Sequence, residues 1–359
     1  MKDNGFDVIM ISSEGKELPD TIQNENCRHI IVNMTRKITP LRDLKCLVQL
    51  IRILRKEKPA IVHTHTPKAG LLGMIAARFC GIKIRIHTVA GLPLMVEKGF
   101  RCYLLKKTER ITAKAASQVW PNSHSILDYM KLHHLADPQK LSVIGKGSTN
   151  GIDTDYYNPE NLDLNLENDI KRNINYSTQN KYLLFTGRLV TDKGVVELVR
   201  SFTLLQQKRT NLKLILIGDF EENLDPLTGA TKIKIETHPS IIHINWTNDV
   251  KYYMKLAHYF IFPSHREGFP NVLLQAGAMG LPIVCSKIPG NIDIVTHQET
   301  GLMFDSGNDQ QMVELIEWAL DNPGQMADMA KNLQRVIQIE YRRENIWQNI
   351  LEAYKSALN

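Results

Sequence analysis

Residues 263–282 read PSHREGFPNVLLQAGAMGLP and carry the densest pattern in the chain. They follow a short apolar run at residues 259–262, which predicts a buried strand that ends at Pro263. Pro270 is expected near the first turn of a helix over residues 271–279, because proline is favoured at that position. The stretch therefore predicts a strand, a turn and a helix whose free N-terminal N–H groups face the turn.

The same alternation fills the rest of the second half. Further strands are predicted at residues 182–185, 212–217 and 241–244, and a helix at residues 194–205. Parallel strands joined by right-handed helical crossovers form a sheet that helices cover on both faces. Ligands of such sheets bind at the carboxyl ends of the strands, so the turns after these strands are the places to search for a site.

The first half shows a similar pattern of short β-branched runs and helical segments. The predicted strands are at residues 6–11, 30–32, 60–63, 82–87, 118–120 and 141–144. The predicted helices are near residues 41–57, 67–80, 100–116 and 123–132. The chain is therefore expected to be an α/β protein with two Rossmann-like, doubly wound domains in tandem.

The polar stretch at residues 153–180 contains few large apolar side chains and predicts the domain boundary. We expect a first domain over residues 1–153, a linker over 154–180, a second domain over 181–340 and a C-terminal helix over 341–359. A Rossmann-like domain normally opens with a strand, a glycine-rich turn and a helix. Because the first predicted strand begins at Phe6, the first domain is expected to lack that opening unit.

Length and composition fit a globular protein of two domains. The chain has 359 residues, of which 43% are hydrophobic and 23% charged, as is ordinary for folded soluble proteins. Five cysteines without paired spacing predict neither a disulfide framework nor a zinc site. A charged N-terminal stretch and the polar residues within the uncharged run 268–286 argue against a signal peptide and a membrane span, so a cytoplasmic protein is expected.

Charge is divided unevenly along the chain. Residues 1–150 carry a net charge of +12 and residues 151–359 a net charge of −6. A basic half favours contact with phosphates, although a merely solvated surface would look the same. Residues 98–114 predict a basic amphipathic helix, which can lie on an anionic membrane surface or pack as an ordinary surface helix. No nucleic-acid-binding motif accompanies the charge, so no nucleic acid partner is expected.

Residues 263–282 resemble the donor-site signature of the retaining GT-B glycosyltransferases of family four, which use nucleotide sugars. The resemblance implies that Glu267 binds hydroxyls of the donor sugar. The family usually has a second glutamate that clasps the ribose, whereas this chain has Gln275, whose amide can still donate to and accept from hydroxyls. The other donor-binding residues that the resemblance implies here are Gly268, Phe269, Pro270, Asn271 and Val272.

Residues 186–194, TGRLVTDKG, lie between a predicted strand and a predicted helix and resemble the phosphate clamp of the same family. Arg188 and Lys193 would stabilise the leaving nucleoside diphosphate, with Gly187 in the donor-binding turn. Together with Glu267 they are the expected catalytic residues. This charge stabilisation needs no metal ion, so no metal or other cofactor is expected.

Residues 147–155, GSTNGIDTD, resemble the interdomain segment of the family. Asp153 and Asp155 also form an Asp-x-Asp pattern, which could indicate a metal-dependent transferase. The interdomain motif is the simpler explanation, and its glycines suit a hinge that closes the domains.

Candidate residues for the acceptor side follow two predicted strands of the first domain. His65 and Lys68 lie in the stretch HTHTPKAG at residues 63–70, and His87 ends the next strand. His63 and His65 could ligate a metal, but the pattern offers no third ligand. The family often has a histidine where this chain has Ala90, so His87 cannot be equated with it.

The resemblance implies a sugar transferase of capsule, exopolysaccharide or O-antigen assembly. Such an enzyme would move a hexose or N-acetylhexosamine, with retention, from a UDP-linked donor to a polyprenyl-diphosphate-linked saccharide. It would work as a peripheral protein on the anionic inner face of the plasma membrane. The alternative is a catalytically impaired or truncated partner subunit, favoured by the missing opening unit, Gln275 and Ala90. A sugar-nucleotide epimerase of similar architecture is disfavoured by the set Arg188, Lys193 and Glu267.

Overall fold

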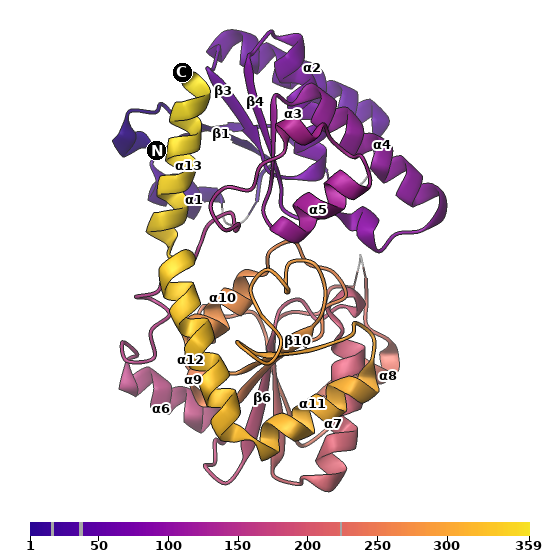
Figure 1. Cartoon of the computed structure of the whole chain (residues 1–359), viewed down its shortest axis with the longest axis vertical. Helices are drawn as coiled ribbons and strands as arrows, with labels where there is room; N and C mark the ends of the chain where they lie inside the picture. Colours follow the sequence, from indigo (N-terminus) through magenta and orange to yellow (C-terminus); the bar gives the residue numbers. More distant parts are fainter. Residues whose placement is uncertain (16–17, 36–38, 223–224) are drawn as a thin grey trace. The chain divides into compact units, whose positions relative to one another are not determined.

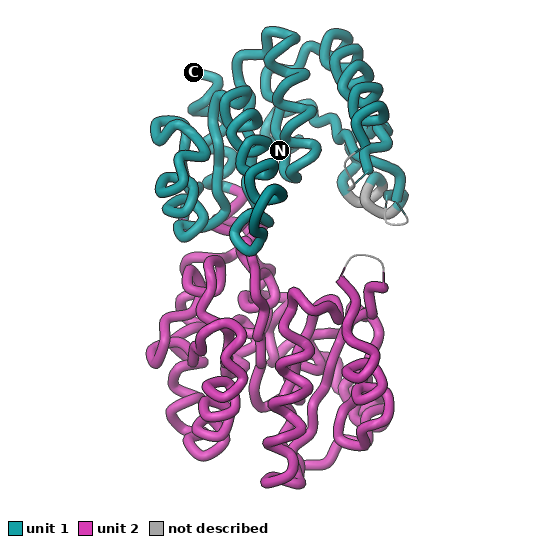
Figure 2. Tube along the Cα trace, turned by 90° about the vertical axis from the view of Figure 1, so that its right-hand side faces the viewer, with its two compact units in different colours: residues 1–145, 348–359 teal, residues 146–347 magenta. Residues whose placement is uncertain are grey.

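The structure is a computed structural model that describes residues 1–15, 18–35, 39–222 and 225–359. The chain divides into two compact units (Figure 2). Unit 1 contains residues 1–145 and 348–359, and unit 2 contains residues 146–347. The division falls earlier than the predicted boundary at residue 153, and the last residues of the chain return to the first unit.

A six-stranded parallel sheet forms the centre of unit 2. Its strands are β6 (Lys181–Thr186), β7 (Leu212–Ile217), β8 (Ile241–Ile244), β9 (Tyr259–Phe262), β10 (Ile283–Ser286) and β11 (Leu302–Phe304). They lie in the order β11-β10-β9-β6-β7-β8, which is the strand order of a Rossmann fold. The direction of winding reverses between β6 and β9, and ligands of open α/β sheets bind at that switch point.

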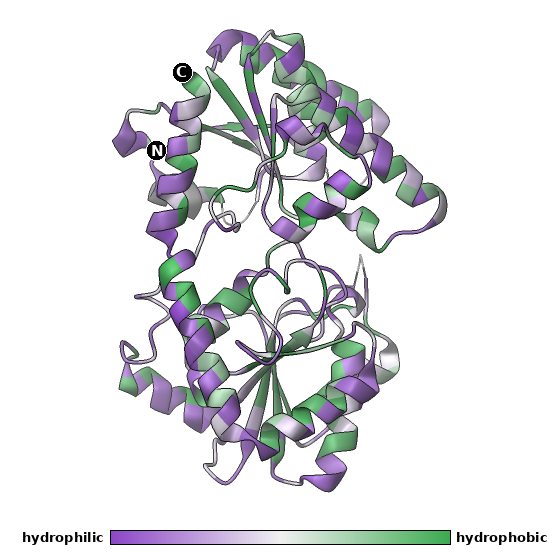
Figure 3. Ribbon diagram, viewed as in Figure 1, coloured by the Kyte–Doolittle hydropathy of each residue, from purple (hydrophilic) through white to green (hydrophobic). Residues whose placement is uncertain are grey.

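Helices cover both faces of this sheet (Figure 1). One group consists of α7 (Val195–Lys208), α8 (Gly229–Thr237) and α11 (Asp309–Asp321), and the other of α9 (Val250–Leu256), α10 (Asn271–Ala278) and α12 (Pro323–Glu340). Because both faces are covered, the strands are almost continuously apolar (Figure 3). All four residues of β9 are buried.

The predicted linker at residues 154–180 contains a helix, α6 (Leu164–Asn173). Asp163 caps it by accepting a hydrogen bond from the N–H of Asn165 at 2.8 Å. Ile170 and Ile174 pack into the core of unit 2. The segment is therefore part of unit 2, and its two core residues are too sparse in a polar stretch to give a helical pattern.

Unit 1 contains two parallel sheets. Strand β1 (Ile9–Ser12) pairs with β2 (Arg28–Ile31), and β4 (Ile84–Val89) lies between β3 (Ile61–Thr64) and β5 (Gln118–Pro121). The helices are α1 (Leu18–Glu25), α2 (Pro40–Glu57), α3 (Pro67–Phe79), α4 (Gly99–Ala115) and α5 (His124–Leu132). The four helices predicted for the first half are present as α2, α3, α4 and α5. Helix α3 packs between α2 and α4.

The predicted strand at residues 141–144 is wrong. Only Leu141 pairs with the sheet, through a single bridge to Val119. The N–H of Ser142 still donates to the carbonyl of Val119 at 3.1 Å. Beyond it the chain turns at Gly145, whose φ is 58°, a conformation that glycine adopts readily and that ends an extended strand.

Helix α13 (Arg343–Leu358) starts in unit 2 and ends in unit 1. In unit 1 the Tyr354 ring stacks on Trp120, with 5.7 Å between the ring centroids, and its hydroxyl is hydrogen-bonded to the His63 ring. The second ring nitrogen of His63 is hydrogen-bonded to Thr88 at 2.7 Å. The C-terminal residues thus complete one face of the sheet β3-β4-β5.

Across the described residues, we find no helix with the length and apolar character needed to cross a membrane.

Candidate functional site

A cavity of about 860 Å³ opens at the carboxyl ends of the strands of unit 2. Its walls come from residues 186–193 after β6, 217–219 after β7, 246–250 after β8 and 262–275 after β9. The segment 153–157 closes it on a further side, together with Arg343. The cavity therefore lies at the switch point that the strand order predicts as a ligand site.

Glycines allow the turns after β6 and β7 to approach each other. A Cβ atom on Gly218 would lie 2.0 Å from the carbonyl oxygen of Gly187. The N–H of Gly187 donates to the carbonyl of Ile217 at 2.9 Å. This contact brings the turn that carries Arg188 and Lys193 to the floor of the cavity.

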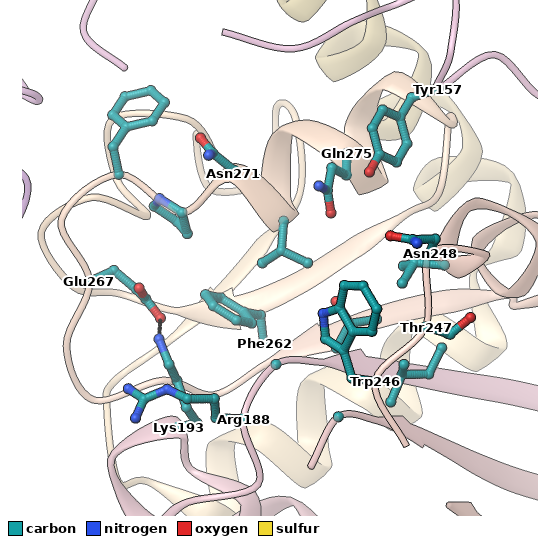
Figure 4. A pocket seen from close by; sticks show the side chains of 18 of the residues that line it. Tyr157, Arg188, Lys193, Trp246, Thr247, Asn248, Phe262, Glu267, Asn271 and Gln275 are labelled. Carbon is teal, nitrogen blue, oxygen red and sulfur yellow. Dashed lines mark hydrogen bonds and ion pairs between the residues drawn. The ribbon is translucent and has the colours of Figure 1, made fainter. Parts of the chain in front are cut away.

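Asp192 connects the turn after β6 with the loop after β9. Its carbonyl oxygen accepts a hydrogen bond from the N–H of His265 at 2.9 Å, and its carboxylate accepts one from Arg266 at 2.6 Å. Next to it, Lys193 forms an ion pair with Glu267 (Figure 4). The two paired side chains are 17% and 12% exposed, so this charge pair is largely shielded from water.

Arg188 is the second cation in the cavity, and it pairs with Glu221 in the loop after β7. Helix α10 begins at Asn271, which lines the same cavity, and Pro270 is its N-cap residue. A helix N-terminus offers unsatisfied N–H groups and partial positive charge to an anion. The arrangement suits a diphosphate, which would compete with the carboxylates for Arg188 and Lys193.

His265 supports the loop that carries Glu267. Its Nε2 lies 3.3 Å from a carboxylate oxygen of Glu197, and its Nδ1 lies 2.9 Å from the hydroxyl of Ser306. The hydrogen bond with Glu197 raises the pKa of His265 and lowers the pKa of the glutamate. The loop is thereby tied to α7 on one side and to residue 306 on the other.

The opposite wall of the cavity holds Gln275 of α10 and Tyr157 (Figure 4). Burial raises the pKa of Tyr157 to about 12, so its hydroxyl stays protonated at neutral pH. Asp153 shapes the turn before Tyr157 by accepting hydrogen bonds from the N–H groups of Asp155 and Tyr156 at 3.2 and 2.8 Å. The first aspartate of the Asp-x-Asp pattern thus organises a backbone turn.

Sequence reasoning missed the residues after β8. Trp246, Thr247 and Asn248 line the cavity, and the N–H of Trp246 donates to the carboxylate of Asp219 at 3.0 Å. No familiar motif marks these positions. The rule that ligands bind beyond the carboxyl ends of parallel strands would have marked Asp219 and Trp246, because each closely follows a predicted strand.

His87, one of the three candidate acceptor-side residues, lies in unit 1 and is only 3% exposed. Its Nδ1 is hydrogen-bonded to Thr64 at 2.8 Å. A Cβ atom on Gly70 would lie 2.3 Å from its ring, so the ring packs directly on α3. Burial lowers the pKa of His87 to about 4, and this geometry gives it a packing role.

The other two candidates occupy the start of α3. The His65 ring lies 4.1 Å from the ring of His63, and Lys68 pairs with Asp43 at 2.7 Å. Their part in acceptor binding stays a prediction. Within the described ranges, no group of three or more histidine, cysteine, aspartate or glutamate side chains is placed to hold a metal ion.

Comparison with known proteins identifies the family. Residues 167–336 match the family described as glycosyl transferases group 1, and residues 1–123 match the one described as glycosyl transferase 4-like. The chain is 32% identical over 358 residues to the capsular polysaccharide biosynthesis glycosyltransferase CapM of Staphylococcus aureus. That match covers 100% of this chain and 92% of CapM. The chain belongs to the glycosyl transferases group 1 family.

Two more proteins resemble this group 1 glycosyltransferase. The Escherichia coli UDP-Gal:α-D-GlcNAc-diphosphoundecaprenol α-1,3-galactosyltransferase is 26% identical over 321 residues, with 88% of this chain and 81% of that protein covered. The crystal structure of Anabaena HepE in complex with UDP-glucose has a TM-score of 0.79 at 17% identity, covering 97% of this chain and 91% of that one. The likeness confirms the predicted GT-B fold.

Proposed function

We propose that this group 1 glycosyltransferase moves a hexose or N-acetylhexosamine from a UDP-linked donor to a polyprenyl-diphosphate-linked saccharide, with retention of configuration. One observation carries the donor side of the proposal: the cavity of unit 2 holds Arg188, Lys193 and Glu267 at one end and is also lined by the start of α10. The name of the Escherichia coli relative, a UDP-Gal and diphosphoundecaprenol enzyme, supports the donor and acceptor classes.

The charged end of the cavity would hold the diphosphate and the sugar. Negative charge grows on the leaving diphosphate as the glycosidic bond breaks, and preorganised cations stabilise it. In this proposal the diphosphate replaces Glu221 as the ion-pair partner of Arg188. It also binds Lys193, which remains paired with Glu267. The carboxylate of Glu267 would hold hydroxyls of the donor sugar. Two side-chain cations supply the charge here, so the proposed reaction needs no metal ion.

Retention would follow from a same-face displacement. The bond between the anomeric carbon and the donor phosphate oxygen breaks through an oxocarbenium-like state. The acceptor oxygen then bonds to that carbon on the same face, and its proton passes to an oxygen of the departing diphosphate. The protein positions the donor and the acceptor and stabilises the charge on the departing diphosphate.

Helix α4 supports a membrane location for the acceptor. Phe100, Tyr103 and Leu104 lie on one face of this helix, and each is between 39% and 77% exposed. Lys98 and Lys107 are exposed beside them, and the ammonium group of Lys107 lies 4.8 Å from the centre of the Tyr103 ring. An apolar stripe flanked by lysines suits an anionic bilayer surface. We therefore propose that unit 1 binds the inner face of the plasma membrane.

A thermal-shift screen of nucleotide sugars tests the donor assignment, because a ligand that binds only the folded protein raises its melting temperature. A transfer assay with a polyprenyl-diphosphate-linked saccharide follows, and NMR of the product reads the anomeric configuration. Failure of every nucleotide sugar to raise the melting temperature would overturn the proposal. Donor binding without transfer to any such acceptor would instead support a catalytically impaired partner subunit.

A further inference from the structure

Three consecutive side chains of the loop after β9 pair with the turn after β6 and the start of α7. The pairs, which we call the three loop pairs, are His265–Glu197, Arg266–Asp192 and Glu267–Lys193. Their charges are complementary when His265 is protonated. Because residues 265–267 are successive, a shift of the loop at one pair also displaces its neighbours.

The members of these pairs differ in what they face. Lys193 and Glu267 line the cavity, whereas His265 is not among its lining residues in the described parts of the chain. The two ring nitrogens of His265 are directed to Glu197 at 3.3 Å and to the hydroxyl of Ser306 at 2.9 Å. An effect of His265 on a ligand in the cavity must therefore act through the position of the loop.

His265 is the member of the three loop pairs whose charge changes near neutral pH. As an imidazolium it donates from both nitrogens, which suits Glu197 and Ser306 together, whereas a neutral ring has one donor. The hydrogen bond with Glu197 raises the pKa of His265 above its ordinary value of about 6.5. The charged form therefore persists to a higher pH than in a free histidine.

The charged groups around His265 are mostly acidic. They are Glu197 and Arg200 of α7, Asp309 at the start of α11, Asp192 after β6 and Asp225 after β7. Arg200 is paired with Asp309 at 3.0 Å, and Arg266 is paired with Asp192 at 2.6 Å. One oxygen of Glu197 is buried without a hydrogen-bond partner in the described structure. Loss of the His265 charge would leave this half-buried carboxylate without its ion-pair partner, which is costly.

We propose that the protonated ring of His265 is a positioning residue that holds Glu267 in place for the donor sugar, so that a nucleotide sugar binds less tightly once the ring loses its proton. This inference rests on the proposed nucleotide-sugar donor and adds a dependence on pH. The sign follows from the pairs: as pH rises through the pKa of His265, Glu197 loses its cation and the loop is held less firmly. Among the described residues that line the cavity there is no histidine or cysteine, so the lining itself offers no side chain that ordinarily titrates in this range.

The test is calorimetric titration of the full chain with UDP-galactose, UDP-glucose and UDP-N-acetylglucosamine from about pH 6 to about pH 9, which spans the ordinary and the raised pKa of histidine. Both phosphates of a nucleotide sugar are esterified, so the probe keeps its charge over this range. The affinity for the tightest-binding probe should fall by about tenfold from the acidic to the alkaline end, the size of one charge-assisted hydrogen bond.

Two variants separate a positioning role from a merely structural one. His265→Gln should bind the probe at the weaker, alkaline level at every pH. Glu197→Gln should move the loss of affinity to lower pH, because the carboxylate no longer raises the pKa of His265; NMR titration of the imidazole C–H signals measures that pKa directly. His238→Gln is the matched control, since His238 precedes β8 at the end of the sheet opposite to the cavity. It should retain the pH dependence of the wild type.

Other outcomes would overturn the inference. Affinity that does not change with pH contradicts it, and so does an equal fall in the wild type and in His265→Gln. In the second case another group would titrate, such as His243, which is hydrogen-bonded to the carbonyl of Gly218. If His265→Gln fails to fold, an unchanged midpoint in Glu197→Gln is the contradicting result. A wild type that binds none of the three probes at any pH overturns the proposed UDP-linked donor as well, whereas binding without pH dependence overturns this inference alone.

Discussion

Lys193 and Glu267 form an ion pair that joins the turn after β6 to the loop after β9, across 74 residues of sequence. Each side chain is largely buried, and each has a proposed ligand of its own, the diphosphate for the lysine and the sugar for the glutamate. In this structure they neutralise each other. Removing either one leaves a largely buried charge without its partner, which is costly.

Lys193→Ala should lower transfer by roughly 100-fold or more, because one preorganised cation at the developing charge is lost. Steady-state rates with donor and acceptor give the measurement, and circular dichroism checks folding. Lys208→Ala is the matched control, since Lys208 pairs with Glu317 on the surface of the same unit. Wild-type rates for Lys193→Ala would refute its role.

Glu267→Gln should reduce turnover while keeping or increasing the affinity for the free nucleoside diphosphate. The amide retains the shape of the carboxylate but no longer neutralises Lys193, so the cation becomes more available to the diphosphate. Calorimetry with the diphosphate and turnover with the intact donor separate the two effects. Unchanged turnover would contradict the assignment of Glu267 to the donor sugar.

Gln275→Glu should leave nucleotide affinity unchanged or improve it. The carboxylate can still accept hydrogen bonds from ribose hydroxyls, as at the second glutamate that the family usually has. Calorimetric titration with UDP measures the effect. A clear loss of affinity would show that residue 275 does not contact the ribose.

Replacing Lys98, Arg101 and Lys107 with glutamine should release the protein from anionic vesicles. Basic residues near such a surface contribute about 1 kcal/mol each, so three correspond to roughly 100-fold in partitioning. Sedimentation with vesicles that contain phosphatidylglycerol measures the bound fraction. The control replaces the exposed Lys208, Lys234 and Lys331 of unit 2. Equal sedimentation of both triple variants would remove the membrane assignment of α4.

Stability should fall in mild acid because His87 is buried and neutral. Its pKa is about 4 when folded and about 6.5 when unfolded, so the unfolded chain binds more protons between these values. The contribution of His87 to the free energy of unfolding should therefore drop as pH falls through this window, by roughly 1.4 kcal/mol per pH unit at most. His87→Asn should flatten the slope, as urea unfolding at several pH values would show. If the free energy of unfolding of the variant depends on pH as steeply as that of the wild type, other groups than His87 cause the acid sensitivity.

Local patterns were sufficient to predict most of unit 2. The buried strand β9 and the helix start at Asn271 are encoded within a few residues, as an apolar run and a proline. The glycines at 187 and 194 mark a turn before α7 in the same local way. These signals placed Arg188, Lys193 and Glu267 at neighbouring strand ends, where the structure brings them into one cavity.

What could not be predicted depends on contacts between distant segments. Tyr157 and Gln275 line one cavity although they are far apart in the sequence, and nothing local to either residue indicates this. Trp246 closely follows a predicted strand, so the rule on strand ends could have marked it, but which residues share the cavity with it depends on the order of strands in the sheet. The pairing of Arg188 with Glu221 likewise joins two loops whose proximity comes from the close approach of Gly187 and Gly218.

The stacking of Tyr354 on Trp120 has a consequence for biosynthesis. Residues near the end of the chain complete a face of the unit that is translated first. During synthesis, Tyr354 cannot cover His63 and Trp120 until all of unit 2 has been translated. A nascent chain halted before residue 354 would leave the aromatic surface around Trp120 uncovered.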